Sequence, residues 1–257
     1  MTDPISQLIF GWRNKVLVAL CCGLFILTAC GPSSSDRPAP ILLFIGNGTS
    51  PNDVRAVERI LDAKWLSYST VDSSHLNAMT EGQLLAHRLL IIPGGNYLTM
   101  SAGFTPDTAT NIHNAVQNGL NYLGICAGGL MAGNAATNSL NLTTGVRVGF
   151  YAAVNRGIHK TVVPLQFADA TTQEHYWEDG PHFNGWGEIV ARYPDGSSAI
   201  VEGRSGKGWV ILCGTHPEAP EVWRRGMSFT APASIANAYA GTLVEAAFHG
   251  TSLSHFR

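Results

Sequence analysis

The stretch that most constrains the fold is 122–133, where a short apolar run meets a cysteine among small residues. The run 122–125 is typical of a buried strand, and it ends at Cys126. Gly124 and Gly128 stand two residues away on either side of the cysteine. A strand that turns sharply into a helix needs such small residues, and with serine this arrangement is the nucleophile elbow. The pattern predicts a strand, a strained turn and a helix, with the Cys126 side chain above the sheet.

Two interpretations of Cys126 are open at this point. At the N-terminus of a helix, free N–H groups and the helix dipole favour the thiolate form, so Cys126 could be a nucleophile. A buried structural cysteine in a packing helix rich in glycine and alanine fits the same residues equally well. The elbow alone does not choose between them.

The chain before the elbow alternates between apolar runs and helical patterns. Strands that are buried on both faces of a sheet have continuous apolar sequences. The predicted strands are 41–45, 66–71 and 89–93. One helix is predicted to begin at Pro51 behind Ser50 as its N-cap, and another to cover 106–118 and end at Gly119. Residues 76–85 fit either a loop or a short helix, and the whole alternation predicts an α/β fold with a parallel sheet.

The middle of the chain, 143–208, differs from the rest. Its short β-like runs predict a β-rich insertion. Between two of them lies the aromatic segment 174–183, which we interpret as a loop over the site, with Trp177 and Gly180 contacting the substrate. An exposed loop with a few packed aromatic side chains is an equally good interpretation.

The same segment holds two histidines and several acids. Besides Glu174 they are His175, His182, Glu178 and Asp179, and these four are the candidates for a metal site. Their spacing matches no ligand pattern of a known metal site, so we predict that the protein has no metal centre and no cofactor.

A second strand end carries a possible catalytic base. The glycine-flanked apolar run 208–213 is followed closely by His216 and Glu218. A cysteine nucleophile needs a base, and the base needs a group that orients it. The sequence therefore predicts a triad of Cys126, His216 and Glu218.

The turn after the strand 89–93 could complete this site. It contains Gly94 and Gly95, whose lack of side chains lets backbone N–H groups approach a ligand closely. Together with the N–H of Ala127 they could form an oxyanion hole at the carboxyl ends of the strands. A plain tight turn would have the same sequence.

The N-terminus predicts export and anchoring. Basic residues precede the apolar run 16–27, which ends at Leu-Thr-Ala before Cys30. This order resembles the lipobox of bacterial lipoproteins, which implies a signal peptide over 1–29, a palmitate-type lipid on Cys30 and a tether over 30–40. We expect the protein on the periplasmic face of the cell envelope, in the outer membrane rather than the inner one. An uncleaved signal anchor is the alternative.

Charge and cysteine content narrow the remaining choices. With 16 basic and 18 acidic residues the formal net charge is −2, which gives no support for nucleic-acid binding. Of the five cysteines, only Cys126 and Cys213 would remain free in the mature chain. In an exported protein these two could form a disulfide, and Cys126 would then be no nucleophile.

Taken together, three motifs resemble a known superfamily. They are Ile91-Ile-Pro-Gly-Gly95, Gly124-Ile-Cys-Ala-Gly128 and His216-Pro-Glu218, in that order. They are similar to the signatures of the class I glutamine amidotransferase-like superfamily, and most similar to the domain at the N-terminus of biotin–protein ligases (BPL_N). The resemblance covers 41–250 and leaves 251–257 as a tail.

The resemblance implies a flavodoxin-like α/β fold and assigns roles to residues. Cys126 would be the nucleophile, His216 the base and Glu218 its orienting acid. Gly94 or Gly95 would form the oxyanion hole with the N–H of Ala127.

Two departures from the superfamily pattern affect the predicted substrate. Glutamine amidotransferases usually have Gln four residues after the cysteine, where this chain has Leu130, and related peptidases have His where this chain has Ala127. We therefore expect a hydrolase of a small amide or a γ-glutamyl, peptide-like substrate that works through a thioester. The alternatives are a binding lipoprotein that keeps the pocket without turnover, and a structural or redox-responsive protein with a disulfide.

Overall fold

The structure is a computed structural model and describes residues 37–151 and 160–257. The predicted signal peptide, Cys30 and most of the predicted tether lie outside these residues. Among the described residues, no helix has both the length and the apolar character to cross a membrane.

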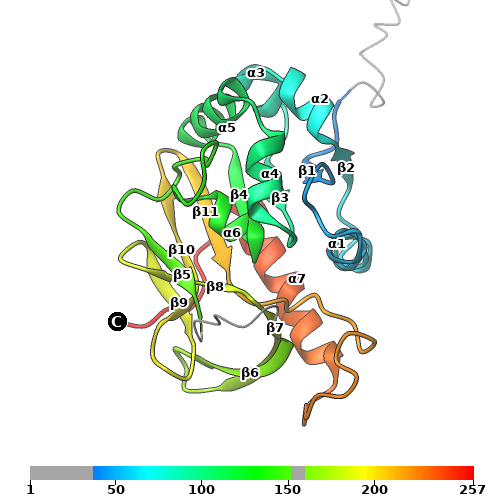
Figure 1. Cartoon of the computed structure of the whole chain (residues 1–257), viewed down its shortest axis with the longest axis vertical. Helices are drawn as coiled ribbons and strands as arrows, with labels where there is room; N and C mark the ends of the chain where they lie inside the picture. Colours follow the sequence, from blue (N-terminus) through cyan, green and yellow to red (C-terminus); the bar gives the residue numbers. More distant parts are fainter. Residues whose placement is uncertain (1–36, 152–159) are drawn as a thin grey trace, which may run out of the picture. The chain divides into compact units, whose positions relative to one another are not determined.

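A nine-stranded mixed sheet forms the centre of the described structure (Figure 1). Across the sheet the strands are β2 (Tyr68–Val71), β1 (Ile41–Phe44), β3 (Leu89–Ile92), β4 (Asn121–Ile125), β11 (Gly208–Cys213), β10 (Ser198–Ser205), β9 (Glu188–Arg192), β6 (Lys160–Phe167) and β7 (Thr172–Glu178). The five strands from β2 to β11 are parallel, and the others pair antiparallel. A separate antiparallel pair joins β5 (Arg147–Phe150) to β8 (Pro181–Asn184). The predicted α/β class with a β-rich insertion is confirmed.

Helices cover both faces of the parallel part of the sheet. They are α1 (Pro51–Ala63), α2 (Ser73–Ala78), α3 (Glu81–Leu84), α4 (Tyr97–Gly103), α5 (Pro106–Asn118), α6 (Ala127–Met131) and α7 (Ala233–His249). Side chains of α1 and α7 share one hydrophobic core with one face of the strands. Side chains of α5 and α6 share a second core with the other face.

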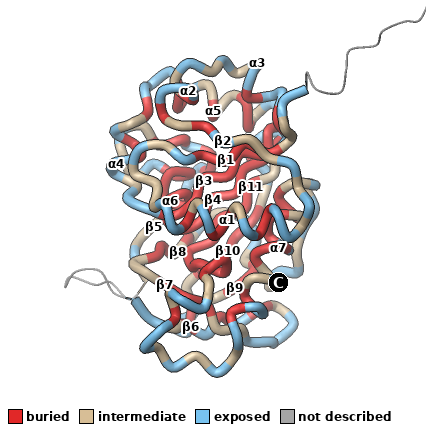
Figure 2. The backbone as a smooth tube through the Cα atoms, turned by 90° about the vertical axis from the view of Figure 1, so that its right-hand side faces the viewer, coloured by how far each residue is buried: buried red, intermediate tan, exposed pale blue. Residues whose placement is uncertain are grey.

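The continuous apolar runs explain why the sheet is buried on both sides. Along β1, Ile41 and Leu43 point into the core with α1 and α7, whereas Leu42 and Phe44 point into the other core. Successive strand residues face opposite sides, so a strand covered on both sides is apolar at nearly every position. Figure 2 shows the buried residues following the strands through the middle of the structure.

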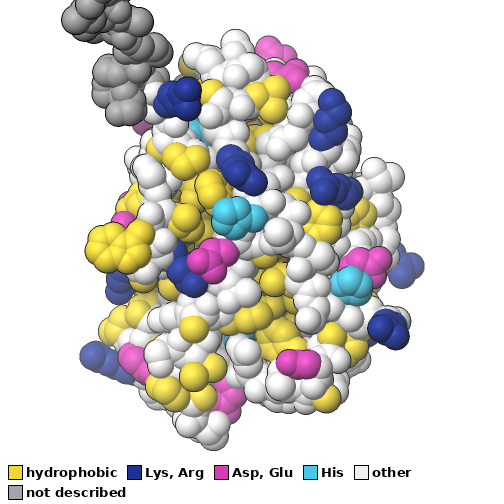
Figure 3. All heavy atoms as spheres, turned by 180° about the vertical axis from the view of Figure 1, so that it is seen from behind, with side chains coloured by type: hydrophobic (Ala, Val, Ile, Leu, Met, Phe, Trp, Pro, Cys, Tyr) yellow, Lys and Arg dark blue, Asp and Glu magenta, His cyan; other side chains and the backbone are white. Residues whose placement is uncertain are grey.

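The surface shows no separation of charge by sign on the face drawn in Figure 3. Both basic and acidic side chains are visible there, and apolar side chains lie among them. This agrees with the nearly balanced content of basic and acidic residues.

Three segments differ from, or go beyond, the prediction. Residues 76–85 fall largely into the two short helices α2 and α3, the second with a capping box between Thr80 and Gln83. The sequence patterns do not predict the helix α4, which has Asn96 as its N-cap. The segment 174–183 is no loop, because most of it lies in β7 and β8. Its aromatic residues pair across the strands, as Tyr176 does with Val162, which is the environment that aromatic and β-branched residues prefer.

The elbow between β4 and α6 is as sharp as the glycines predict. Cys126 has φ 49° and ψ −108°, a conformation that L-residues rarely adopt. A Cβ on Gly128 would lie 1.9 Å from the carbonyl oxygen of Ile92, and one on Gly124 would lie 2.5 Å from the carbonyl oxygen of Gly128. Only glycine lets α6 pack this closely on the sheet. The helix itself is short, so packing rather than helix length fixes the turn.

Tyr122 ties the elbow to the strand that leads into it. Its hydroxyl donates a hydrogen bond of 2.6 Å to the carbonyl oxygen of Gly128, and the side chain is fully buried. This bond satisfies a carbonyl that water cannot reach. The cost of an unsatisfied buried group is about 1–3 kcal/mol.

Replacing Tyr122 by Phe should therefore lower the free energy of unfolding by about 1–3 kcal/mol. Urea denaturation followed by circular dichroism measures this change. Tyr68→Phe is the matched control, because Tyr68 is partly exposed on β2 and should lose well under ~1 kcal/mol. Equal losses in the two variants would show that the buried hydrogen bond does not stabilise the elbow.

Candidate active site

A cavity of about 650 Å³ opens where several parallel strands end. Its lining comes from the segments that follow β1, β3, β4 and β11, together with residues of β5, β6 and β7. The lining residues are Ser50, Asn52, Asp53, Gly95, Asn96, Tyr97, Leu98, Cys126, Ala127, Leu130, Phe150, Lys160, Tyr176, Glu178, Asp179, His216, Val222 and Trp223. Ligand sites in open α/β sheets form at this edge, outside the carboxyl ends of the strands.

The elbow places Cys126 in this cavity. Its side chain is largely buried, and its Sγ lies 3.8 Å from the carbonyl oxygen of Glu178, which it can reach as a weak donor. Ala127, the next residue, also lines the cavity. Because Ala127 is the first residue of α6, its N–H has no acceptor within the helix and is available to a ligand.

His216 lies in the same cavity, on the segment that follows β11. Its backbone N–H donates to the carbonyl oxygen of Tyr176 at 2.8 Å, which fixes the loop against β7. Its ring Nδ1 is 2.9 Å from Oε1 of Glu218. A carboxylate only accepts hydrogen bonds, so Nδ1 carries the proton and donates it to Glu218. In this tautomer Nε2 is the ring atom left for a reactant, which is the arrangement that a general base requires.

A second acidic residue, Asp53, contacts the same histidine and does not emerge from the sequence patterns. Its Oδ1 lies 2.9 Å from Nδ1 of His216 but accepts no hydrogen bond from any described residue. Asp53 belongs to the first turn of α1, where Ser50 caps its backbone N–H. An aspartate at this position of a helix is common for reasons of capping and helix dipole, so no sequence signal assigns it to the site.

These ionisable groups shift one another's pKa values. Burial alone would lower the pKa of His216, but the negative charges of Cys126, Asp53 and Glu218 raise it well above its usual value. Burial pushes the pKa of Asp53 upward, and the charge of His216 more than offsets this, so the net direction is downward. Burial also raises the pKa of Glu218, and here it outweighs the opposing effect of His216. The arrangement favours a charged imidazolium between its neighbours.

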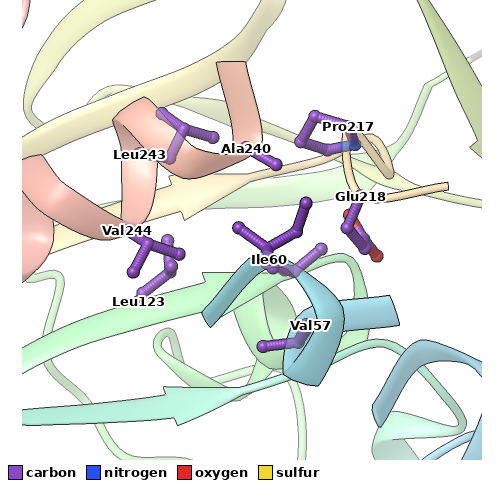
Figure 4. Close-up of a pocket in the computed structure, with 9 residues that line it drawn as sticks. Val57, Ile60, Leu123, Pro217, Glu218, Ala240, Leu243 and Val244 are labelled. Carbon is purple, nitrogen blue, oxygen red and sulfur yellow. The ribbon is translucent and has the colours of Figure 1, made fainter. Parts of the chain in front are cut away.

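Glu218 has aliphatic side chains on its far side (Figure 4). A void of only about 10 Å³ separates it from Val57 and Ile60 of α1 and from Leu243 of α7. Its second oxygen, Oε2, has no hydrogen-bond partner among the described residues. A desolvated carboxylate with one partner depends strongly on that partner, so Glu218 holds the His216 ring firmly.

The two glycines of the predicted oxyanion hole have different positions. Gly95 lines the cavity, with φ 146°, and a Cβ there would lie 2.1 Å from the carbonyl oxygen of Gly48. Gly94 does not line it. A Cβ on Gly94 would lie 2.3 Å from Oδ1 of Asp53 and 2.6 Å from Cε1 of His216. Gly94 thus makes room for the contact between the aspartate and the histidine.

The structure does not bring Trp177 and Gly180 to the cavity. Trp177 is 1% exposed and belongs to the core, and its Nε1 donates to the carbonyl oxygen of Gly180. Tyr176 and Glu178, its neighbours on the strand, line the cavity instead. Because successive residues of a strand face opposite sides, a loop interpretation of this segment selects the wrong side chain.

The metal site considered for the segment 174–183 does not match the described geometry. His175 is fully buried with Nδ1 2.8 Å from Thr215 Oγ1, and His182 contacts Asn184, so the four residues considered for a metal do not converge. Asp53, His216 and Glu218 do place ligand-type atoms within 4.8 Å of one another. A proton on Nδ1 of His216 already explains why the two carboxylates lie close to that nitrogen.

The disulfide alternative is not observed. The thiols of Cys126 and Cys213 are both free and buried. Burial raises the pKa of Cys213 to about 12, so this second thiol is unreactive at neutral pH.

The segment that carries the site matches known proteins. The family described as "Biotin-protein ligase, N terminal" matches residues 39–240. A biotin–protein ligase of Schizosaccharomyces pombe is 28% identical over 211 residues, covering 69% of this chain and 33% of the ligase. The chain thus spans about a third of the length of that relative.

Solved structures share the fold at low identity. A putative GMP synthase component from Thermoplasma acidophilum has a TM-score of 0.53 and 10% identity, over 82% of this chain and 96% of its own. A cytoplasmic protein of Salmonella typhimurium LT2 has a TM-score of 0.51 and 15% identity, over 83% and 100%. The GH42 β-galactosidase Gan42B of G. stearothermophilus has a TM-score of 0.50 and 12% identity, over 81% of this chain and 30% of its own. At these identities the likeness shows the fold alone.

Gly94→Ala should disturb the site while the chain still folds. The added methyl group must displace Asp53 or the His216 ring, and such overpacking costs about 1–3 kcal/mol. We expect a lower unfolding midpoint and slower alkylation of Cys126, measured by mass spectrometry of the labelled peptide. Gly82→Ala is the control, because the nearest atom to its Cβ is 4.0 Å away. Unchanged alkylation in Gly94→Ala would show that the close contact is not needed.

Acid should destabilise the protein through His175. Burial, and to a lesser degree the charge of Arg224, lower the pKa of this histidine from 6.5 to about 3. The unfolded chain therefore binds a proton that the folded chain does not, and stability falls as the pH drops from 6.5 toward 3. The slope is about 1.4 kcal/mol per pH unit for this one group. The free energy of unfolding, measured by urea denaturation from about pH 7 to about pH 4, should depend less steeply on pH in His175→Gln than in the wild type. Equal pH dependence in the two proteins would contradict this assignment.

Proposed function

The chain belongs to the family of biotin–protein ligase N-terminal domains, and on that premise we propose that it is a cysteine amide hydrolase of the glutamine amidotransferase-like type. The proposal includes a position in the bacterial envelope, held by a lipid on Cys30. One observation carries the enzymatic part: Cys126 on the elbow and His216 line one cavity, and Glu218 holds Nδ1 of that histidine.

The chemistry follows from the positions of these groups. His216 takes the thiol proton on Nε2, and the Cys126 sulfur adds to the amide carbonyl. The negative oxygen that forms faces the N–H groups of Ala127 and of the Gly95 turn. His216 then gives its proton to the leaving amine, which departs as the thioester forms. Water, deprotonated by His216, attacks the thioester and releases the acid and the free thiol.

The cavity supports a substrate larger than a simple amide. Its volume of about 650 Å³ lies in the range of sites that enclose drug-sized ligands. Leu98, Phe150 and Val222 line it while remaining exposed, so its mouth is apolar. Within it, Lys160 forms an ion pair of 3.2 Å with Glu178. We propose a peptide-like or γ-glutamyl amide that carries an apolar group.

A binding function without turnover is the second candidate. It is favoured by the low exposure of Cys126, 7%, and by the position of its sulfur beneath the Glu178 carbonyl. In that case the cavity would recognise a ligand and the thiol would stay unreactive. Reactivity of the thiol therefore distinguishes the two candidates.

The decisive test is the rate of iodoacetamide labelling at Cys126 across pH, read by peptide mass spectrometry on the full chain in detergent. For an enzyme, labelling should remain fast at about pH 6, where an ordinary cysteine is almost entirely in the thiol form. His216→Ala should slow it by at least about tenfold, because a general base of this kind contributes roughly 10²–10⁴-fold.

Cys213→Ser is the control, and in this variant iodoacetamide should label Cys126 at the wild-type rate. If Cys126 reacts no faster than an unperturbed thiol and His216→Ala changes nothing, the binding function stands in place of the hydrolase. If labelling is fast, screening of γ-glutamyl and peptide amides for amine release follows.

A further inference from the structure

The imidazole of His216 meets two carboxylates at one nitrogen. Oε1 of Glu218 and Oδ1 of Asp53 each lie 2.9 Å from Nδ1. One N–H can make one good hydrogen bond, and Glu218 accepts it. Asp53 Oδ1 is left without a hydrogen bond from the described residues, so its interaction with the ring is between charges.

We propose that Asp53 is a positioning residue for the triad, which holds His216 in the imidazolium form before a substrate arrives. Glu218 orients the ring of His216. Asp53 supplies an additional negative charge, which stabilises the second proton on that ring. Cys126 lines the same cavity as His216, and in the proposed mechanism the second proton of the ring comes from its thiol. The inference about the charge state of His216 does not depend on the proposed function, whereas the use of that charge in catalysis rests on it.

The placement of Asp53 supports this role. It comes from α1, whereas His216 and Glu218 come from the segment after β11, so two separate elements converge on Nδ1. The Asp53 side chain is 10% exposed and lines the cavity, whereas that of Glu218 is 1% exposed and lies behind the ring. Gly94 gives the space in which the Asp53 carboxylate reaches the ring. An opposite charge at such a distance moves a pKa by about 1–3 units.

Other groups around the ring do not replace this charge. Tyr176 and Trp223 contact it with their ring edges, at centroid distances of 5.8 and 6.1 Å. Burial and the neighbouring Glu178 raise the pKa of Tyr176, so it is neutral. Cys213 is neutral as well. Glu178, Asp179 and Lys160 also line the cavity, and Glu178 and Lys160 pair with each other.

The experiment is an NMR titration of the His216 imidazole in the full chain in detergent, for wild type, Asp53→Asn and Asp53→Glu. Asparagine keeps the shape and the backbone N–H that Ser50 caps, and removes only the charge. We expect Asp53→Asn to lower the titration midpoint of His216 by about 1–3 pH units. The Nδ1–H tautomer should persist, because Glu218 still accepts its bond. Asp53→Glu should restore part of the shift.

The matched control is Asp62→Asn, which removes an exposed carboxylate from the same helix. It should leave the His216 titration unchanged. Iodoacetamide labelling of Cys126 at neutral pH should fall in Asp53→Asn and not in the control. A His216 midpoint that is equal in wild type and Asp53→Asn overturns the proposal, and so does loss of the Nδ1–H tautomer together with unchanged labelling.

The outcomes separate this inference from the proposed function. If Asp53→Asn shifts the midpoint but the wild type releases no amine from any amide, Asp53 has the proposed role in a site that does not hydrolyse amides. If the wild type is an amidase and Asp53→Asn leaves the midpoint and the pH profile of kcat/KM unchanged, the inference fails and the hydrolase stands.

Discussion

The site depends on one steric constraint, the contact between the backbone of α6 and the end of β3. A side chain on Gly128 would run into the Ile92 carbonyl oxygen, and only glycine allows the approach. Because α6 lies so close, the chain must turn within one residue, and Cys126 adopts its rare backbone conformation there. The thiol is therefore set at the edge of the sheet by packing, and the buried hydroxyl of Tyr122 secures that packing.

Parallel strands bring the remaining groups to the same edge. The segment after β11 carries His216, and the pairing of β11 with β4 places it beside the elbow. The helix after β1 carries Asp53, and the turn after β3 leaves it room at Gly94. The resulting cluster balances a buried imidazole against carboxylates from two elements. No member would tolerate its burial alone, since an unpaired buried charge is costly.

Much of this arrangement can be predicted from the sequence, for physical reasons. Strands covered on both faces leave continuous apolar runs, and an elbow leaves glycines around its cysteine, so β1, β3, β4 and the turn at Cys126 are recognisable. The loop prediction for 174–183 is wrong because glycine, proline and charges there resemble a loop, although the aromatic residues pair in β7 and β8. The prediction that Trp177 faces the cavity fails for the same reason. Asp53 carries no sequence signal at all, because its contact with His216 exists only after α1 packs on the sheet.

The origin of Asp53 on α1 affects how the protein acquires its chemistry. The elbow and the histidine belong to neighbouring strands, whereas Asp53 arrives with the first helix of the fold. A chain that has formed β4 and β11 but has not yet docked α1 would hold a histidine backed by a single carboxylate. If Asp53 has the role that we propose, docking of α1 also completes the charge environment of His216, and the reactivity of Cys126 would report on that docking.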